Sequence, residues 1–371
     1  MKLGILTSSR ADFGIYLPLL KSLQAEDAIS FEIIAFGTHL STFHGETISQ
    51  IISNGFQVKH RIPSMLLSDS AESVSTAMGL TTTKFASFWA DYADDFDLVL
   101  CLGDRYEMFA AVTAGIPFNI RFVHLHGGET SLGAIDNIFR HAITLASKYH
   151  FVATAEHADK VAALTGSAQG IFPVGALSLD NIGSLDLLSL EAFKAKWQMD
   201  LSRKTILTTF HPETVNAEQN RFYAQELINV ILSNTPYQFL ITMPNADTAG
   251  NMIRQLFTEK LQSASHVALI ENLGSQSYFT AMKYCAFLLG NTSSGIIEAA
   301  SFGKYVINLG DRQKGRSCGP NVIHVPINVE AINQAIASVA EAEDYSGPNP
   351  YFRGNASGEI IKKLKEISAY E

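Results

Sequence analysis

Cysteine and charge are both scarce in this chain of 371 residues, and each shortage argues against a class of protein. The three cysteines, Cys101, Cys285 and Cys318, form an odd set without CxxC or Cys/His ligand spacing, which argues against a disulfide framework and against a structural zinc site. The 27 basic residues are outnumbered by 36 acidic ones, which leaves a net charge of -9. A general nucleic-acid binder needs a basic face, so we expect no nucleic-acid partner.

Long apolar runs are missing as well. No stretch approaches the roughly 18 apolar residues that a membrane-spanning helix needs, so we expect no membrane partner. The N-terminal sequence MKLGILTSSRADFG has one lysine and a short apolar run, but no small-residue cleavage site follows. The run is more typical of a first buried strand than of a signal peptide, and we expect a cytoplasmic protein.

Short apolar, β-branched runs alternate with longer amphipathic segments along most of the chain. Continuous apolar runs are typical of strands covered on both faces, as in a parallel sheet. The alternation predicts an α/β fold with two Rossmann-like, doubly wound domains facing a cleft. The expected strands are 2–7, 31–36, 97–102, 120–125, 149–154, 205–210, 238–243, 266–270, 286–290 and 304–309, and the expected helices include 216–232, 275–284 and 294–301.

The series of strands pauses between residues 173 and 204, where we place the domain junction. The predicted domains are 1–175 and 176–351, and the amphipathic helix expected within 352–371 would pack back on the first domain. Open α/β sheets bind ligands at the carboxyl ends of their strands. Functional residues are therefore expected in the loops that follow the strands.

The loop after the first strand is rich in small polar residues and contains Arg10. Backbone N–H groups between a strand and a helix suit an anion, and the arginine adds a charged fork for phosphate. The alternative is an ordinary capped turn with a solvated arginine. GxGxxG is absent from this loop, which argues against a nicotinamide dinucleotide site.

Charged side chains follow the strands that end at Leu102 and Leu125. Asp104 and Glu129 could converge as a carboxylate pair for acid/base chemistry, with Asp136 nearby at the start of a helix. Arg105 in such a loop would need an anionic partner. The alternative for Asp104 is to cap the next helix. His124 and His126 could suggest a metal site, but strand alternation would also place both on one face, and we predict no metal because no cysteine or third histidine is near.

The second half repeats the pattern. His211 follows a strand and is a candidate general acid or phosphate ligand, and a structural loop histidine is the alternative. The segment Gly290–Glu298 joins a strand, small hydroxyl side chains and a helix start, which predicts a neutral phosphate cradle with a carboxylate for sugar hydroxyls. Polar residues 243–247 and three cations in 310–316 end the neighbouring strands.

Taken in order, SSRADFG, GDRYE, HLHGGE, IDNIFRHAIT, PVGALSLD, MPNADTAGN and GNTSSGIIEAASFGKYVINLGDRQKGR span nearly the whole chain. They resemble the hydrolysing UDP-N-acetylglucosamine 2-epimerases that begin sialic-acid and related nonulosonate synthesis. Non-hydrolysing relatives resemble the chain less, because they carry RPEAIK where this sequence has RADFGI. The resemblance implies a fold of the glycosyltransferase-B type with UDP held mainly by the second domain.

The resemblance also implies a reaction. UDP-N-acetylglucosamine and water would give N-acetylmannosamine and UDP through a 2-acetamidoglucal, without a metal or redox cofactor and in a homodimer or homotetramer. The implied acid/base residues are Asp104, Glu129, Asp136 and His211. The implied nucleotide and phosphate residues are Arg10, Ala11, Arg105, Asn245, Asp247, Thr292, Ser293, Glu298 and Arg312.

Three alternatives remain open. The same reaction could act on UDP-2,4-diacetamido-2,4,6-trideoxyglucose, as in the legionaminic-acid route. A glycosyltransferase would pass the sugar to an acceptor, and a nucleotide-sugar sensor would only bind it. The three carboxylates Asp104, Glu129 and Asp136 favour elimination of UDP over both transfer and sensing.

Overall fold

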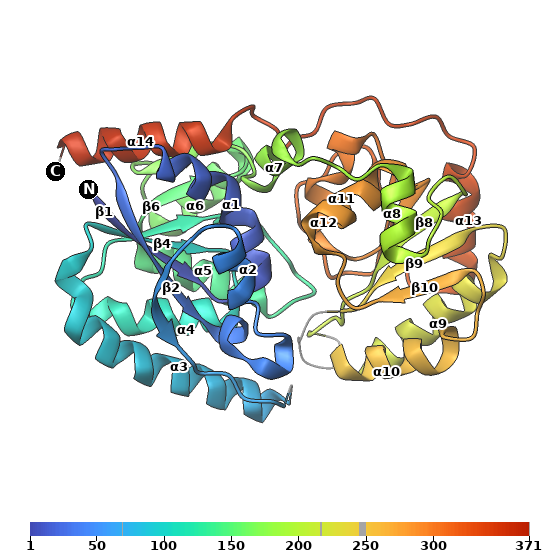
Figure 1. The fold of residues 1–371 in the computed structure, drawn as a ribbon, viewed down its shortest axis with the longest axis horizontal. Helices are drawn as coiled ribbons and strands as arrows, with labels where there is room; N and C mark the ends of the chain where they lie inside the picture. Colours follow the sequence, from blue (N-terminus) through green and yellow to red (C-terminus); the bar gives the residue numbers. More distant parts are fainter. Residues whose placement is uncertain (69, 216, 245–249, 371) are drawn as a thin grey trace. The chain divides into compact units, whose positions relative to one another are not determined.

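The computed structural model describes residues 1–68, 70–215, 217–244 and 250–370, and the chain divides into two compact units, each built on one parallel sheet (Figure 1). Unit 1 comprises Met1–Glu129, Asp136–Gly183 and the segment from Tyr351 onward, and unit 2 comprises Thr130–Ile135 and Ser184–Pro350. The main junction thus follows Gly183, later than the expected 175, and the short segment 130–135 lies with the second half of the chain. In the described part of the chain, no helix is both long enough and apolar enough to cross a bilayer.

Unit 1 contains a seven-stranded sheet with the strand order β3-β2-β1-β4-β5-β6-β7. Its apolar runs are buried on both faces. Along β4, Leu98, Leu100 and Leu102 belong to the core on one face, whereas Val99 and Cys101 belong to the core on the other. The strands are β1 (Lys2–Thr7), β2 (Ser30–Phe36), β3 (Val58–Ile62), β4 (Leu98–Leu102), β5 (Phe122–Leu125), β6 (Ser147–Val152) and β7 (Ile171–Pro173).

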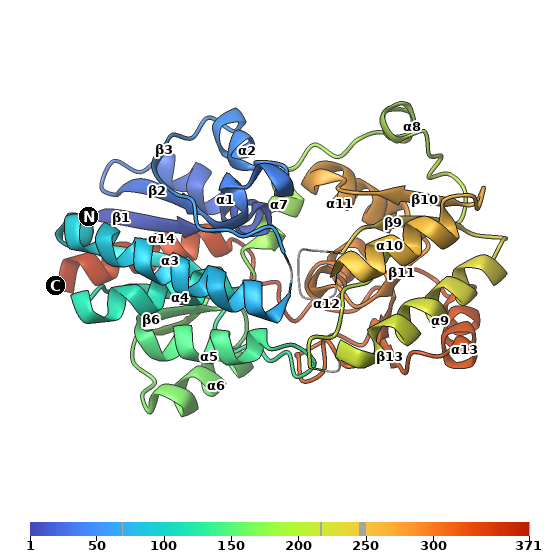
Figure 2. The same ribbon diagram turned by 90° about the horizontal axis from the view of Figure 1, so that it is seen from below.

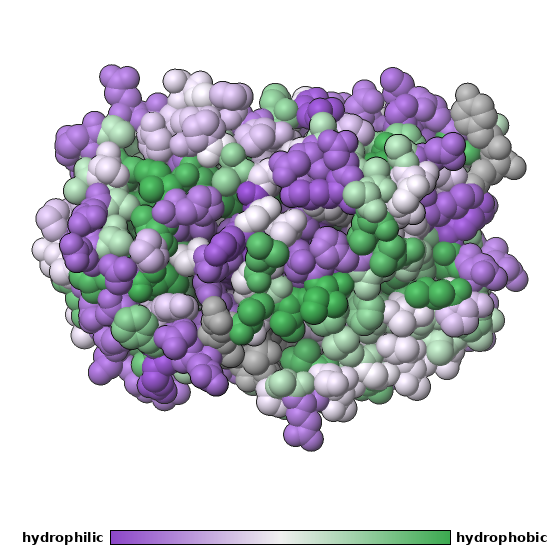
Figure 3. Space-filling view, turned by 180° about the vertical axis from the view of Figure 1, so that it is seen from behind, coloured by the Kyte–Doolittle hydropathy of each residue, from purple (hydrophilic) through white to green (hydrophobic). Residues whose placement is uncertain are grey.

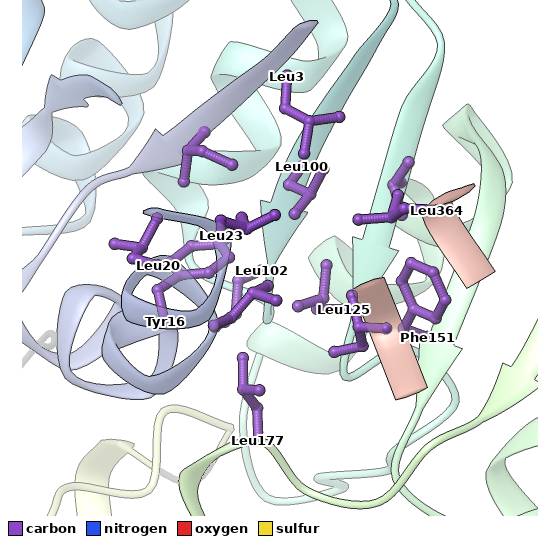
Figure 4. Packing of buried hydrophobic residues seen from close by; sticks show 14 of the residues in the cluster. Leu3, Tyr16, Leu20, Leu23, Leu100, Leu102, Leu125, Phe151, Leu177 and Leu364 are labelled. Atoms are coloured by element: carbon purple, nitrogen blue, oxygen red, sulfur yellow. The ribbon is translucent and has the colours of Figure 1, made fainter. Parts of the chain in front are cut away.

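Helices cover both faces of this sheet. Apolar residues of α1, α2 and α14 pack on one face and those of α3, α4 and α5 on the other; Figure 4 shows Leu100 and Leu102 of β4 near Leu23 of α1. The helices are α1 (Arg10–Gln24), α2 (Ile48–Ser53), α3 (Ala71–Tyr92), α4 (Tyr106–Gly115), α5 (Asp136–Ala146), α6 (Ala155–Thr165), α7 (Ser178–Ser184) and α14 (Ala356–Tyr370).

The C-terminal helix α14 is part of unit 1 and lies beside α1 (Figure 1). The Asp180 carboxylate accepts hydrogen bonds from the backbone N–H groups of Ala356 and Ser357 at 3.1 and 2.6 Å. A carboxylate at a helix N-terminus satisfies unpaired N–H groups and is stabilised by the helix dipole. Asp180 therefore holds the start of α14 against the segment that leads out of unit 1.

Unit 2 contains a six-stranded sheet with the order β10-β9-β8-β11-β12-β13. Figure 2 shows α9, α10 and α13 on one side of the sheet and α8 and α11 on the other, in agreement with its two apolar cores. The strands are β8 (Thr205–Thr209), β9 (Gln238–Thr242), β10 (Val267–Ile270), β11 (Phe287–Gly290), β12 (Val306–Leu309) and β13 (Val322–Val325). The helices are α8 (Leu190–Trp197), α9 (Asn220–Ser233), α10 (Gly250–Leu261), α11 (Gly274–Tyr284), α12 (Ser293–Ile297) and α13 (Val329–Val339).

The predicted α/β class with two doubly wound sheets is confirmed, because all strand pairs in both sheets are parallel and helices cover both faces. Strands β3, β7 and β13 were not predicted, and all three lie at sheet edges. Short 3-10 helices complete the described chain: η1 (Gly37–Leu40), η2 (Thr42–His44), η3 (Ala93–Asp95), η4 (Ile116–Phe118), η5 (Ala217–Gln219) and η6 (Ala299–Phe302).

The strand order reverses between β1 and β4 in unit 1 and between β8 and β11 in unit 2. Loops that leave neighbouring strands in opposite directions open a crevice at the carboxyl ends, which is where open α/β sheets bind ligands. The loops that follow β1, β4, β8 and β11 are therefore the places to look for a site.

Candidate functional site

In the loop after β1, backbone N–H groups donate hydrogen bonds to a carboxylate of the same segment. Asp12 Oδ2 accepts hydrogen bonds from the backbone N–H groups of Ser8 and Ser9 at 2.8 and 3.1 Å. Ser9 is the N-cap of α1, and its Oγ accepts from the Asp12 N–H in a capping box. The backbone N–H groups of Ser8 and Ser9 are thus bound by Asp12, so the capped turn given as the alternative for this loop is present. Arg10 and Ala11 begin the helix, half-buried and exposed respectively.

The loop after β4 contains an internal ion pair. The Arg105 guanidinium donates from Nη2 and Nε to the two carboxylate oxygens of Glu107 at 2.9 and 3.2 Å. Glu107 is fully buried, and that burial raises the pKa of its carboxyl while the neighbouring guanidinium opposes the rise. The anionic partner expected for Arg105 is therefore present two residues away in the same motif. Glu107 belongs to the motif GDRYE and is not among the predicted site residues.

Asp104, in the same loop, pairs with a residue of another element. Its carboxylate Oδ2 accepts from Nη2 of Arg140, which lies on α5 one turn after Asp136. The Arg140 side chain is almost completely buried, whereas that of Asp104 is 23% exposed. The N-cap of α4 is Arg105, so the capping alternative for Asp104 does not hold. Arg140 was not among the predicted site residues, and it joins the loop after β4 to the helix that begins at Asp136.

His124 on β5 is a structural histidine. Its Nε2 lies 2.8 Å from the Gly103 carbonyl oxygen and its Nδ1 lies 3.1 Å from Thr144 Oγ1. The ring is fully buried, and burial lowers its pKa from 6.5 to about 3. A neutral ring donates from Nε2 to the carbonyl and accepts the threonine hydroxyl at Nδ1. Both ring nitrogens are therefore used, and the ring holds Gly103 next to Asp104.

His126 lies beyond the end of β5 with a positive φ of 63°, so strand alternation cannot place it on the same face as His124. Its Nδ1 lies 2.9 Å from Glu129 Oε1, and Glu129 is 2% exposed. A side chain at Gly128 would collide with the carbonyl of His157, so this glycine is required by close backbone packing. Among the residues that the structure describes, no group of three or more metal-ligating side chains is found.

The segment between Glu129 and Asp136 runs along unit 2. Leu132 N–H donates to the Lys314 carbonyl at 3.0 Å, and Ile135 N–H donates to Thr214 Oγ1 at the same distance. A side chain at Gly133 would collide with the backbone of Asp311. Two predicted carboxylates, Glu129 and Asp136, therefore flank a segment whose own hydrogen bonds lie in the other unit.

In unit 2, the loops after β8 and β11 are joined by one buried amide. Asn291 Oδ1 accepts from the His211 backbone N–H at 2.7 Å, and its Nδ2 donates to the His211 carbonyl at 2.8 Å. Asn291 is fully buried and His211 is 8% exposed. The two-way contact positions the backbone that carries the His211 ring. Asn291 was part of the predicted cradle segment but was not assigned this role.

Hydrogen bonds also join the loop after β12 to the loops after β8 and β11. Gln313 Nε2 donates to the Asn291 carbonyl at 2.7 Å, and Arg312 Nε donates to the Pro212 carbonyl at 3.2 Å. Glu213 accepts from the Asp311 N–H at 2.6 Å and is almost completely buried; burial raises the pKa of its carboxyl. The structure thus brings together His211 and Arg312, two residues predicted from separate motifs.

The predicted cradle begins at Gly290, whose φ is 145° and whose replacement by any larger residue would drive a Cβ into the carbonyl of Thr209. Thr292 is the N-cap of α12 and accepts from the Ser294 N–H at 3.3 Å, while Ser293 is exposed. The helix α12 is only five residues long. Glu298 follows it and is 6% exposed.

Tyr278 on α11 was not predicted. Burial of its hydroxyl raises the pKa to about 12, and the charge of Glu298 contributes in the same direction. The phenol is therefore a neutral hydrogen-bonding group near the predicted cradle. Asn245 and Asp247 lie outside the described residues.

The chain is similar to known sequences over nearly its full length. The profile of a family described as UDP-N-acetylglucosamine 2-epimerase matches residues 21–365. The UDP-N,N'-diacetylbacillosamine 2-epimerase (hydrolyzing) of Legionella pneumophila is 34% identical over 99% of this chain and 96% of its own. The polysialic acid biosynthesis protein P7 of Escherichia coli is 32% identical over 99% of this chain and 94% of its own.

A solved structure shares the fold. The UDP-GlcNAc 2-epimerase of Neisseria meningitidis, solved bound to UDP-GlcNAc, superposes with a TM-score of 0.82 at 19% identity over 99% of this chain and all of that one. Fold similarity at this identity concerns the architecture alone. The match of the family profile and the full-length identities above 30% establish that this chain belongs to the UDP-N-acetylglucosamine 2-epimerase family.

Proposed function

We propose that the chain is a hydrolysing 2-epimerase that converts UDP-N-acetylglucosamine and water to N-acetylmannosamine and UDP, the first step of sialic-acid synthesis. Membership of the epimerase family carries this proposal. The ion pair of Asp104 with Arg140 and the contact of Glu129 with His126 support it, because an elimination needs carboxylates for proton transfer and cations for the leaving diphosphate.

In the first step the proton on carbon 2 is removed while the bond from carbon 1 to the diphosphate oxygen breaks. The electron pair of the C–H bond forms the double bond of 2-acetamidoglucal, and UDP leaves with the electrons of the C–O bond. We assign the base to Glu129, because the Asp104 carboxylate is already engaged by the Arg140 guanidinium, whereas Glu129 contacts an imidazole that can pass a proton on.

In the second step water adds to carbon 1 and a proton returns to carbon 2 from the opposite face. The returning proton comes from an exchangeable group, for which Asp104 and Asp136 are the candidates. Overall, one molecule of water is consumed, and the products are UDP and the epimerised free sugar. The reaction needs no redox partner, because no electrons are exchanged with another molecule.

The nucleotide would be held by unit 2, with the phosphates near Thr292, Ser293 and Arg312 and the ribose on Glu298. The joined loops after β8, β11 and β12 support this assignment, because Asn291 and Gln313 hold them in one rigid group. Arg10, Ala11 and Arg105 in unit 1 remain predicted phosphate-binding residues. In unit 2, His211 remains a predicted catalytic residue, and Asn245 and Asp247 remain predicted nucleotide-binding residues.

The sugar is tested by incubating the protein separately with UDP-N-acetylglucosamine and with UDP-2,4-diacetamido-2,4,6-trideoxyglucose, without any acceptor. Proton NMR follows UDP and the free sugar. Turnover of the first substrate alone supports the proposal. Turnover of the second alone would replace it with the same reaction on the diacetamido sugar, which the name of the Legionella relative favours.

In deuterated water the product should carry deuterium at carbon 2. Full retention of the original hydrogen there would refute the elimination route. Release of free sugar only when an acceptor is added would indicate a glycosyltransferase. Tight binding of either nucleotide-sugar without any product would indicate a sensor.

We also propose that the protein is a homodimer or homotetramer. Figure 3 shows apolar side chains gathered in patches on the face of the molecule that it displays. On α5, Ile138 and Leu145 are 69% and 60% exposed and lie two turns apart on one side of the helix. Light scattering should give at least twice the mass of one chain. A lower mass for Leu145→Glu would identify this face, and a monomeric wild type would refute the assembly.

A further inference from the structure

A thiol, an imidazole and an amide are aligned in unit 2, apart from the residues assigned above. Cys318 Sγ lies 3.3 Å from Nε2 of His324, and Nδ1 of His324 lies 3.0 Å from the side-chain amide of Asn308. His324 and Asn308 are directly paired residues of the adjacent strands β13 and β12. The sheet therefore fixes the exposed imidazole and the buried amide, and the partly exposed thiol lies on the side of the imidazole away from the amide.

Asn308 is 1% exposed, and its Oδ1 has no hydrogen-bond partner among the described residues. A half-turn of the amide, which leaves its shape unchanged, brings Oδ1 to Nδ1 of His324. In that arrangement Nδ1 carries the proton and donates it to Asn308, and the lone pair of Nε2 points to Cys318. His324 is exposed at the sheet edge; partial desolvation of its ring lowers the pKa from its ordinary value, and the charge of Asp311 opposes this.

The other two thiols lie in the apolar core. Cys101 and Cys285 are completely or almost completely buried, and burial raises the pKa of each to about 12. The thiolate is the reactive form of cysteine, and a buried thiol in apolar surroundings is inert. The three cysteines therefore separate into two core residues and one thiol that is both accessible and next to a base.

We propose that Cys318, with His324 as its base and Asn308 as the residue that orients the ring, is a nucleophilic thiol site that takes low-molecular-weight disulfides. His324 Nε2 accepts the thiol proton, and Sγ attacks one sulfur of the incoming disulfide. The S–S bond of that molecule breaks, and its second sulfur leaves as a thiolate that takes up the proton. The products are a mixed disulfide on Cys318 and one small thiol, and the incoming disulfide is the oxidant.

The position of Cys318 suggests what the adduct would do. The thiol lies just beyond the loop that carries Arg312 and Gln313, whose side chains contact the backbone of Pro212 and Asn291. A bulky group on Cys318 would displace this loop and weaken UDP binding. This consequence depends on the proposed function, whereas the thiol chemistry does not.

The thiol is tested with Ellman's reagent, an aromatic disulfide, at pH 7 on the native full-length chain. We expect one rapid thiol equivalent that is absent from Cys318→Ser, at a rate roughly tenfold above that of reduced glutathione. The variant His324→Gln should lose most of this advantage, whereas the matched change His266→Gln, on a histidine away from the thiol, should keep it. A wild-type rate no higher than that of reduced glutathione would by itself overturn the proposal. An unchanged rate in His324→Gln would overturn it as well.

The coupling to the nucleotide site is measured separately. The protein is treated with oxidised glutathione, the adduct on Cys318 is confirmed by mass spectrometry, and UDP affinity is measured by calorimetry before and after. We expect a fall in affinity that dithiothreitol reverses and that Cys318→Ser does not show. Equal affinities would overturn the coupling. Failure of the untreated protein to bind UDP would refute the proposed function and leave the thiol result intact.

Discussion

Replacing His124 by glutamine removes a titratable ring but keeps an amide N–H that can donate to the Gly103 carbonyl. In the unfolded chain the ring titrates near 6.5, whereas burial lowers the folded-state pKa to about 3. The folded state therefore binds fewer protons than the unfolded state below pH 6.5. The stability associated with the neutral ring is fully present above pH 6.5 and is lost as the pH falls toward 3.

The size of the loss at pH 5 does not depend on the exact folded-state pKa. The folded ring is still neutral there, so the loss comes from protonation of the unfolded chain and is about 2 kcal/mol. Urea unfolding at pH 7 and pH 5 measures it. Between these two pH values the wild-type free energy of unfolding should fall by about 2 kcal/mol more than that of His124→Gln. An equal fall in both proteins would refute the assignment of a neutral buried ring.

The remaining predictions concern the proposed site and its frame. Glu129→Gln should lower turnover roughly 10²–10⁴-fold, as expected for lost acid/base catalysis, with UDP affinity close to wild type; an unaffected turnover would exclude Glu129 as the base. Glu298→Ala should weaken UDP binding by about 1–3 kcal/mol because a charged hydrogen-bond acceptor is removed, and calorimetry that finds equal affinities would show that the ribose lies elsewhere. Turnover should survive EDTA and need no added NAD; loss in EDTA that a divalent ion restores would overturn this. Gly290→Ala should lower the melting temperature, because its Cβ would meet the Thr209 carbonyl at a positive φ; an unchanged melting temperature would contradict the close approach.

Most interior strands were predictable from the sequence because they contain a continuous apolar run. The run ending at Leu102 becomes β4, which is buried on both faces. Of the four edge strands in the described sheets, the apolar β10 was predicted, whereas β3, β7 and β13 were missed. An edge strand has one neighbour and more solvent, so its sequence need not be apolar, and VKHRI of β3 alternates between exposed and buried residues.

Local polar contacts were within reach of the sequence, and the capped turn after the first strand was the alternative given for that loop. Ser9 and Asp12 have the spacing of a capping box, which signals that the loop after β1 provides its own anion. Arg105 and its partner Glu107 lie only two positions apart, within the motif GDRYE. Such contacts depend on backbone geometry over a few residues, and residue spacing describes that geometry.

The contacts that assemble the candidate site join residues that are far apart in the sequence. Asp104 and Arg140 are 36 residues apart, and His211 and Asn291 are 80 apart. No local pattern relates them, because their proximity results from strand order: β4 neighbours β5, which leads to α5, and β8 neighbours β11 only after the chain has passed through β9 and β10. By itself the sequence determined the α/β class, the family and most of the polar loops. Only the tertiary structure decided which of those loops meet, because parallel pairing brings the carboxyl ends of distant strands to one edge of a sheet.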